Sequence, residues 1–263
     1  MNTTMVNSLW EKMNLAGYTS VITGAGKGLG RSMAIGLAQA GSHVVLMSRT
    51  LKDLEDVKKE IEKYSVEVMT IVADVTDSAS MDEAVDNIMQ RFGRIDVLAH
   101  AAGSSLPKNK SVFDLSDKDW AGLIDANLTA TFFICRAVGK VMVEKGQGSI
   151  INVASVAGQR GRPRNSGYSA AKAGVINFSR ALAMEWASKG VRVNVISPGR
   201  FLTPLTQPEM SDKEKYLAWV NKVPLGRLGD PDEMKEITVW LASKASSFVT
   251  GSTIVIDGGV TLL

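Results

Sequence analysis

Tyr168, Lys172 and Ser155 could together carry out acid–base chemistry on a carbonyl or alcohol oxygen. Tyr168 and Lys172 are four residues apart in a predicted helix, so their side chains share one face. A free phenol has a pKa of about 10, and a neighbouring ammonium favours the phenolate and lowers that pKa toward the neutral range. Tyr168 could then give a proton to a carbonyl oxygen, or take one from an alcohol, while a hydride moves to or from a nicotinamide cofactor. Ser155, just past a predicted strand, could donate a hydrogen bond to the same oxygen.

The Tyr-x-x-x-Lys spacing is weak evidence by itself, because it could be an ordinary pair on the surface of a helix. Ser155 lies thirteen residues before Tyr168 at the end of a predicted strand, and a glycine-rich turn lies far upstream. The order and spacing of these features together favour the catalytic interpretation.

The glycine-rich turn follows the first predicted strand and is suited to bind a pyrophosphate. Residues 23–30 read Thr-Gly-Ala-Gly-Lys-Gly-Leu-Gly, which fits the pattern TGxxxGxG rather than GxGxxG. Glycines let the backbone turn tightly, and the following helix presents free N–H groups and the positive end of its dipole. The alternative is a tight turn that binds nothing, which so many glycines make less favourable. The predicted cofactor residues in this turn are Gly24, Lys27, Gly28, Leu29 and Gly30.

The end of the second predicted strand predicts NADP(H) rather than NAD(H). An NAD site usually has Asp or Glu there to accept a hydrogen bond from the ribose 2′-OH. This chain has Ser48 and Arg49 at that point and no carboxylate. Arg49 could pair with a 2′-phosphate, and Lys27 adds a second cation. The alternative is that both are solvated surface charges and that the site is indifferent to the phosphate.

Residues after the third and fourth predicted strands complete the expected cofactor site. Asp74 could accept a hydrogen bond from the adenine amino group, with the backbone of Val75 beside it. Asp74 could equally belong to the N-cap region of the next helix. The small residues Ala102 and Gly103 would let the backbone approach the cofactor closely.

The elements that must position these residues alternate between strands and helices along the chain. We expect strands ending at Thr23 and covering 43–47, 66–72, 95–99, 149–153, 191–196 and 253–256, and helices over 28–39, about 51–63, from 77, about 117–145, about 167–189 and about 231–243. This is the doubly wound α/β pattern, a Rossmann-type parallel sheet of about seven strands with helices on both faces. Ligands of such sheets bind outside the carboxyl ends of the strands, where these motifs fall. We expect a single domain over 1–263, with a substrate lid at about 199–225.

Composition and charge argue against several classes of protein. A net charge of +3 over 263 residues, without a basic stripe, argues against nucleic-acid binding. His43 and His100 have no neighbouring Cys or His, so we expect no metal site. Cys135 lies in an apolar helical stretch, which predicts a packed core thiol in a reducing cytoplasm. No apolar run approaches the roughly 20 residues that cross a bilayer, and the first 15 residues do not read as a signal peptide.

With these residues in place, the chain resembles the short-chain dehydrogenase/reductases over essentially its whole length. The matching stretches beyond the glycine turn are Asp74-Val75, Ala102-Gly103, Asn127-Leu128-Thr129, Ser155, Tyr168-Ser169-Ala170-Ala171-Lys172, Pro198-Gly199 with Thr203, and Asp257-Gly258-Gly259. The resemblance implies that Asn127, Ser155, Tyr168 and Lys172 are the catalytic residues. It implies that Asn127 holds a water for a proton relay through Lys172, and that Lys172 also holds the nicotinamide ribose.

The same resemblance extends the predicted cofactor site and marks one departure from the family. Pro198, Gly199 and Thr203 are implied to lie at the nicotinamide, with Thr203 meeting its carboxamide. Residues 100–103 read His-Ala-Ala-Gly where the family usually has Asn-Asn-Ala-Gly. Both Asn side chains are therefore lost, while the Ala-Gly pair keeps the close backbone approach.

The predicted reaction is hydride transfer between NADP(H) and the carbonyl or secondary alcohol of a small polar substrate. Four arginines near the site could bind an anionic substrate: Arg160, Arg162, Arg164 and Arg200. The alternative is a solvated or subunit-facing loop. The chain looks most like sugar-acid or polyol enzymes of the gluconate 5-dehydrogenase type, with 3-oxoacyl-carrier-protein reductase as the alternative. A non-catalytic NADP(H)-binding sensor or scaffold is the alternative from another class.

The resemblance also implies a homotetramer, in which the predicted helices 117–145 and 167–189 pack across a twofold axis. Their apolar stripes are consistent with this, but core packing explains the stripes equally well. We expect a cytoplasmic protein whose partners are a small-molecule substrate and copies of itself, with no nucleic acid and no membrane.

Overall fold

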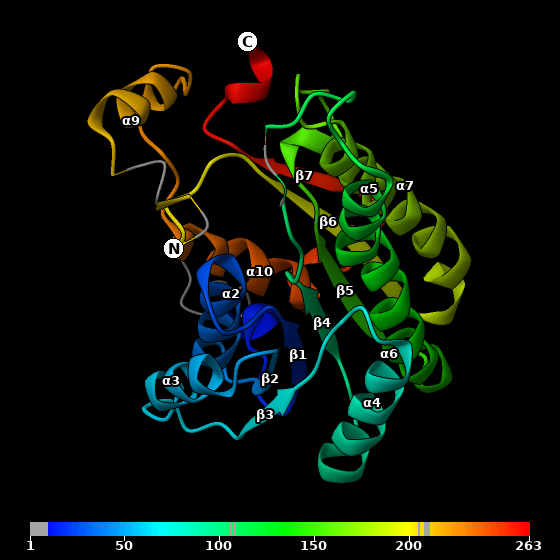
Figure 1. Ribbon diagram of the computed structural model, residues 1–263. Coiled ribbons are helices and arrows are strands. Elements are labelled where there is room, and N and C mark those ends of the chain that lie inside the picture. The colour runs from blue at the N-terminus through cyan, green and yellow to red at the C-terminus, as the bar shows by residue number, and fades with distance from the viewer. Residues whose placement is uncertain (1–9, 106, 108, 205, 208–210) are drawn as a thin grey trace.

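Seven short strands form one parallel sheet in the order β3-β2-β1-β4-β5-β6-β7 (Figure 1). The computed structural model describes residues 10–105, 107, 109–204, 206–207 and 211–263. The strands are β1 (Thr19–Thr23), β2 (His43–Ser48), β3 (Val68–Val72), β4 (Val97–His100), β5 (Gly148–Val153), β6 (Val191–Pro198) and β7 (Thr253–Ile256). The strand order reverses between β1 and β4, which is where doubly wound sheets bind their ligands. The predicted Rossmann-type fold is confirmed.

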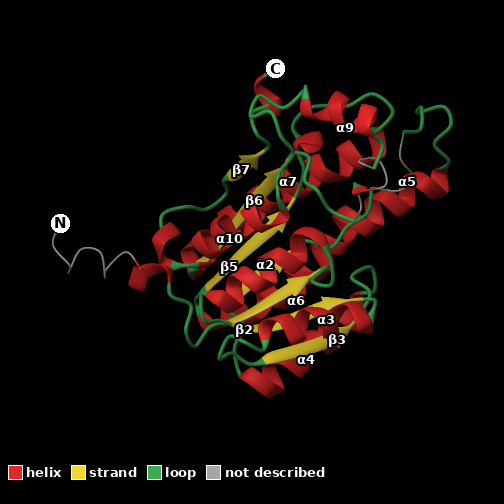
Figure 2. Ribbon diagram, turned by 90° about the vertical axis from the view of Figure 1, so that its left-hand side faces the viewer, coloured by secondary structure: helices red, strands yellow, loops and turns green. Residues whose placement is uncertain are grey.

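Helices cover both faces of the sheet because each strand is apolar on both sides. One face carries α2 (Gly28–Gln39), α3 (Leu51–Ile61) and α10 (Met234–Ala242); the other carries α4 (Ser78–Phe92), α6 (Ala130–Lys145) and α7 (Ser166–Trp186). Figure 2 shows the strands sandwiched between these helices. Successive residues of β5 point to opposite layers, so Ile151 packs in the α2 layer and Ile150 in the α6 layer. These nearly continuous apolar runs are typical of a parallel sheet buried on both faces.

The helix predicted at about 117–145 is wrong as one continuous α-helix. It consists of α5 (Asp117–Ile124), a π-helical turn (Asp125–Thr129) and α6. The amide of Asn127 donates to the carbonyl oxygen of Leu123 at 2.8 Å, one turn earlier, where a backbone N–H would normally bind. The side chain of Asn127 thus competes for a backbone carbonyl at the point where the helix widens to a π-helical turn. π-helical turns are frequent at functional sites.

The combined segment Asp117–Lys145 has the length and hydropathy of a membrane span. However, α6 packs against α4, β4 and β5, and its residues Ile134, Val138 and Met142 are fully buried. We therefore interpret it as a core helix. Cys135 on the same helix is buried, and burial raises the pKa of its thiol to about 12, as expected of a packed core thiol.

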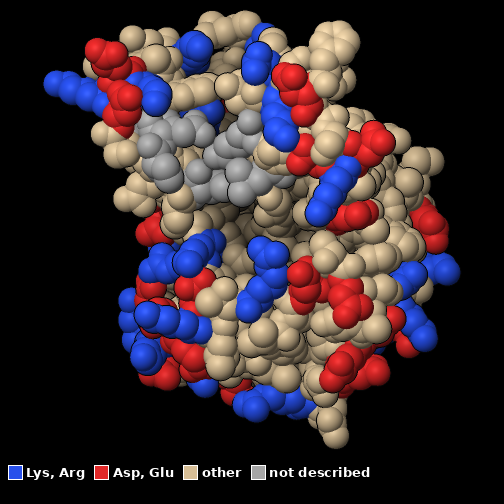
Figure 3. Space-filling view, in the orientation of Figure 1, with Lys and Arg blue, Asp and Glu red and all other residues tan. Residues whose placement is uncertain are grey.

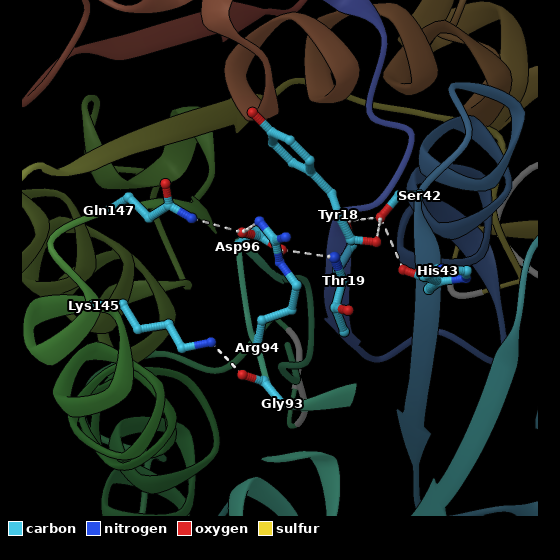
Figure 4. A network of polar contacts seen from close by, with 10 residues as sticks. Tyr18, Thr19, Ser42, His43, Gly93, Arg94, Asp96, Lys145 and Gln147 are labelled. Carbon is cyan, nitrogen blue, oxygen red and sulfur yellow. Dashed lines mark hydrogen bonds and ion pairs between the residues drawn. The ribbon is translucent and has the colours of Figure 1, made fainter. Parts of the chain in front are cut away.

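A polar network closes the sheet at the end opposite the cleft (Figure 4). The buried carboxylate of Asp96 accepts hydrogen bonds from the backbone N–H of Thr19 at 2.8 Å and from two guanidinium nitrogens of Arg94 at 2.6 and 2.7 Å. Gln147 donates to the same carboxylate from the segment before β5. Because each buried oxygen is paired, the network ties β1, β4 and β5 together at their amino ends without leaving an uncompensated charge.

Candidate active site

The carboxyl ends of the central strands open into a cleft of about 1580 Å³. The face of the molecule is hollowed there, and Lys and Arg side chains lie on its rim (Figure 3). Every predicted catalytic and cofactor residue lines this one cleft: Asn127, Ser155, Tyr168 and Lys172, with Gly24, Lys27, Gly28, Leu29, Gly30, Ser48, Arg49, Asp74, Val75, Ala102, Gly103, Pro198, Gly199 and Thr203. The chain therefore brings together residues that are up to about 180 positions apart in sequence.

The glycine turn has a backbone that other residues could not adopt. Gly24 and Gly28 have φ angles of 67° and 56°, in the left-handed region that favours glycine. A Cβ on Gly24 would lie 2.9 Å from the backbone nitrogen of Ala102, and one on Gly30 would collide with the carbonyl of Gly24. Helix α2 begins here without a side-chain cap, so its first N–H groups face the cleft end. This cradle fits a pyrophosphate.

The part of the cleft beside the glycine turn and the end of β2 contains a carboxylate that the sequence analysis missed. Lys27 forms an ion pair with Asp53 in the first turn of α3, at 2.8 Å, so its charge is already partnered. Arg49 is 79% exposed and lies 3.9 Å from the carboxylate of Asp74. Arg49 is thus the more available cation for a 2′-phosphate. The sequence around Asp53 does not distinguish a partner of Lys27 from an ordinary acidic residue in the first turn of a helix.

The side chain of Asp74 forms hydrogen bonds within the turn that precedes α4. Its Oδ1 accepts hydrogen bonds from the backbone N–H and the hydroxyl of Thr76, at 3.0 and 2.8 Å. The pKa of Asp74 is lowered, chiefly by the backbone hydrogen bond from Thr76. The N-cap itself is Asp77. Asp74 therefore belongs to the N-cap region of α4, which was the alternative to a cofactor contact. Its hydrogen bond with adenine stays a prediction.

Tyr168, Ser155 and Lys172 meet at the end of β5. The Tyr168 hydroxyl is hydrogen-bonded to Ser155, and the ammonium of Lys172 lies 5.8 Å from the centre of the phenol ring. Lys172 is buried and donates to the carbonyl oxygen of Val153 at 2.9 Å. Burial lowers the pKa of Lys172 to about 8. The three side chains are arranged as general acid–base chemistry on a shared oxygen requires.

The expected lowering of the Tyr168 pKa by Lys172 is not found in this structure. Burial raises the pKa of the phenol, and this outweighs the opposing effects of the Ser155 hydrogen bond and the positive charge of Arg162. Lys172 is directed to the Val153 carbonyl and is itself easier to deprotonate than a free lysine. Burial desolvates both groups, which disfavours the charged form of each and has no signal in the local sequence.

Asn127 ties the loop after β4 to the π-helical turn. Its amide nitrogen donates to the carbonyl of Ser104 at 2.7 Å, and its amide oxygen accepts from the N–H of Ser104 at 3.3 Å. A Cβ on Gly103 would lie 2.7 Å from that oxygen and 3.4 Å from the ammonium of Lys172. Asn127 therefore lies beside Lys172 with both of its amide N–H groups engaged, and its predicted role in a water relay stays a prediction.

His100 replaces the first Asn that the family usually has after β4. Its Nδ1 lies 2.7 Å from the hydroxyl of Thr23, which also accepts a hydrogen bond from the N–H of Ala102. Burial, with the charge of Lys172, lowers the pKa of His100 to about 3, so the ring is neutral. A neutral imidazole at the end of β4 thus contacts the Thr23 hydroxyl that also binds the N–H of Ala102.

The structure separates the four arginines that were predicted as candidates for an anion site. Arg160 donates to the carbonyl oxygens of Val260, Thr261 and Leu263. Arg164 donates to the carbonyl oxygen of Asn109 at 3.0 Å. The other two, Arg162 and Arg200, lie over the indole ring of Trp219. The sequence analysis did not identify Trp219 and Lys222 as cleft residues. The local sequence does not show which side of α9 faces the cleft.

The predicted lid contains helix α9 (Lys213–Val220), which lies apart from the other helices in Figure 1. It has no buried residue, and residues 205 and 208–210 of the predicted lid lie outside the described residues. Opening and closing of this segment stays a prediction.

Removing the Arg160 guanidinium is expected to release the C-terminal turn from the cleft. Val260, Thr261 and Leu263 line the cleft, and three hydrogen bonds from Arg160 hold them. With each bond worth about 1 kcal/mol, Arg160→Ala should speed amide hydrogen exchange in residues 258–263 at least about tenfold. Arg164→Ala is the matched control, because its partner is Asn109. Unchanged exchange in Arg160→Ala would contradict this anchoring.

The chain resembles known proteins in sequence and in structure. A family model described as Enoyl-(Acyl carrier protein) reductase matches residues 24–261. The chain is 36% identical to 3-oxoacyl-[acyl-carrier-protein] reductase FabG of Thermotoga maritima over 250 residues, covering 95% of this chain and 100% of that one. It is 35% identical to gluconate 5-dehydrogenase of Gluconobacter oxydans over 253 residues, covering 96% and 98%.

A solved structure has the same fold. The gluconate 5-dehydrogenase of Burkholderia cenocepacia, in complex with NADP and tartrate, aligns with a TM-score of 0.91 and 31% identity, covering 97% of this chain and 99% of that one. With the matched family model, this likeness confirms the predicted class: the chain belongs to the short-chain dehydrogenase/reductase family of oxidoreductases. Among the described residues, no group of three or more His, Cys, Asp or Glu side chains could hold a metal ion.

Proposed function

We propose that this protein is an NADP(H)-dependent dehydrogenase/reductase that interconverts a ketone and a secondary alcohol in a small carboxylated polar substrate of the sugar-acid type. The observation that carries the proposal is the meeting of Tyr168, Ser155 and Lys172 in a cleft that also contains the glycine cradle. Similarity to gluconate 5-dehydrogenases, one of them solved with NADP and tartrate, supports the cofactor and the substrate class.

Each residue has a role in this proposal. NADP(H), when bound, supplies or accepts the hydride. Tyr168 donates its phenolic proton to the substrate oxygen during reduction and takes it back during oxidation. Ser155 donates a hydrogen bond to the same oxygen and so stabilises the charge that develops there. Lys172 lies beside the phenol ring and donates to the carbonyl oxygen of Val153, while Asn127 fixes the loop beside Lys172.

Different residues along the cleft hold different parts of the cofactor in this proposal. The turn with Gly24, Gly28 and Gly30 holds the pyrophosphate, and Arg49 holds the 2′-phosphate. Thr203 reaches the nicotinamide carboxamide. Thr203 lies beside Gly28, since a Cβ on that glycine would lie 3.5 Å from the threonine side chain.

Replacing Arg49 by serine is expected to raise KM for NADPH about tenfold or more and to leave KM for NADH nearly unchanged. The reason is that Arg49 is 79% exposed and pairs with Asp74 only at 3.9 Å, whereas Lys27 pairs with Asp53 at 2.8 Å. Steady-state kinetics with both cofactors measure this, and Lys52→Ser is the control, because Lys52 is exposed on α3 outside the cleft. An equal loss with both cofactors would show that Arg49 does not recognise the phosphate.

The second candidate is a 3-oxoacyl-carrier-protein reductase, which the 36% identity to the Thermotoga maritima enzyme favours. A panel of gluconate, a neutral polyol of the same length and an acetoacetyl thioester, assayed with NADP⁺ or NADPH, separates the candidates. We expect turnover of gluconate well above that of the polyol. Turnover of the thioester alone would identify the second candidate. NADPH binding without any turnover would identify a sensor or scaffold and overturn the enzyme assignment for this chain.

We also propose that the protein is a cytoplasmic homotetramer in which α6 and α7 pack across a twofold axis. Exposed apolar side chains on these helices support this, since Phe132 is 40% and Met184 is 86% exposed. Light scattering of the purified protein measures the assembly, and a monomer would contradict it.

A further inference from the structure

Three cations gather around the ring of Trp219 at the lid end of the cleft. The guanidinium carbon of Arg200 lies 3.2 Å from the ring centre, that of Arg162 lies 5.0 Å away, and the ammonium of Lys222 lies 5.2 Å away. They come from three different segments: the loop between Ser155 and Tyr168, the residues just after β6, and the turn after α9. All four residues of this Trp219 cluster line the cleft.

The positive charge of the Trp219 cluster is not neutralised by the indole. A cation over an aromatic ring gains about 0.5–2 kcal/mol, but the pair keeps its full charge. Within the part of the chain that the structure describes, no ion pair joins Arg162 or Lys222 to a carboxylate. The charges of Arg162 and Lys222 lie around the same ring and repel one another, so their arrangement is most favourable when an anion lies between them.

The Trp219 cluster also reaches the reaction centre. Arg162 is close enough to Tyr168 for its charge to act on the phenol. A substrate whose reacting oxygen lies at Tyr168 and Ser155 would therefore direct its far end toward the lid. Arg160 and Arg164 do not compete for that end, because they bind the C-terminal turn and Asn109.

We propose that Arg162, Arg200 and Lys222 bind the carboxylate of the substrate, and that Trp219 on α9 is the platform that positions them. This inference rests on the proposed function and specifies where the anionic end of the sugar acid lies. Lys222 and Trp219 then determine specificity for acids over neutral polyols. Bound anion would also hold α9 against the loop that carries Arg162, since the cations of both segments contact the same ligand.

Binding of gluconate to the protein loaded with NADPH tests this without turnover, because the reduced cofactor cannot accept a hydride from the alcohol. Isothermal titration calorimetry should show affinity for gluconate weakened about tenfold or more in Arg162→Gln and in Lys222→Gln, as expected for a lost charge-assisted contact. Trp219→Leu should weaken gluconate binding while NADPH binding stays normal. Arg164→Gln is the matched control, from the same loop and cleft, and should bind gluconate within about twofold of wild type. Sorbitol, a neutral ligand of the same length, should not distinguish the variants.

The outcomes separate this inference from the proposed function. If Arg162→Gln and Lys222→Gln bind gluconate as wild type does, the inference is overturned, even if gluconate is a good substrate. If both variants bind gluconate poorly while the wild type oxidises no sugar acid, the carboxylate site is supported and the proposed function fails. If inorganic phosphate displaces gluconate equally well from wild type and from both variants, the Trp219 cluster is not the anion site.

Discussion

Replacing Tyr168 by phenylalanine is expected to lower kcat by about 10²- to 10⁴-fold, because the variant cannot transfer the proton that the substrate oxygen gains or loses. The variant keeps the ring over Lys172 and loses only the hydroxyl that is hydrogen-bonded to Ser155. Affinity for NADPH and the melting temperature should therefore change little. Kinetics of ketone reduction at saturating NADPH, with fluorescence titration of NADPH, measure the two effects separately.

Two further variants define what the tyrosine result means. Tyr18→Phe is the control for loss of a phenolic hydroxyl, because Tyr18 directly precedes the amino end of β1 and does not line the cleft. Ser155→Ala should reduce kcat as well, since it removes the second donor to the same oxygen. If Tyr168→Phe retained more than about a tenth of the wild-type kcat, Tyr168 would not be the acid–base group.

Replacing Lys172 by methionine is expected to lower kcat about 10²-fold or more and to change how stability depends on pH. Lys172 is buried, and its pKa falls from the ordinary value of 10.5 to about 8. The unfolded chain therefore keeps this proton up to a higher pH than the folded protein does. Raising the pH through this window favours the folded state of the wild type, and methionine removes that dependence.

The size of the pH effect follows from the shift. Between pH 7 and pH 10, the free energy of unfolding of the wild type should rise by about 2 kcal/mol relative to that of Lys172→Met. Urea denaturation of cofactor-free wild type and Lys172→Met at several pH values measures the difference between their free energies of unfolding. The titration of other groups cancels in this difference, because both proteins contain them. A difference that stayed constant, or that fell as the pH rose, would show that the lysine is not buried as a charged group. Lys140→Met, on an exposed part of α6, is the control.

The fold could be predicted from the sequence because its strands are apolar on both faces. The runs at β2, β5 and β6 have the near-continuous hydrophobicity of buried parallel strands, and Gly41, Gly146 and Gly190 end the preceding helices or turns with positive φ angles. The positions of the catalytic residues could be predicted from the same pattern of strands and helices. Each comes directly after a strand or on the helix that follows it, so the parallel order brings them to one edge of the sheet.

What could not be predicted depends on contacts between distant segments. The ion pair of Lys27 with Asp53 joins the glycine turn to the first turn of α3, and the π-helical turn at Asn127 arises where its amide binds the chain at Ser104. The raised pKa of Tyr168 reflects burial, which has no local sequence signal. The four arginines near the site look alike in sequence, and only packing shows that Arg160 and Arg164 serve the backbone of other segments.

The central claim is that Tyr168 and Ser155 share the reacting oxygen of the substrate at the nicotinamide end of the cleft. A crystal structure of the protein with NADP⁺ and a slowly reacting hydroxy acid tests this most directly. We predict that the substrate hydroxyl lies within about 2.6–3.2 Å of both Tyr168 Oη and Ser155 Oγ, with its carboxylate among the cations around Trp219. A substrate bound with its hydroxyl out of reach of both side chains, beside an occupied cofactor site, would contradict the account.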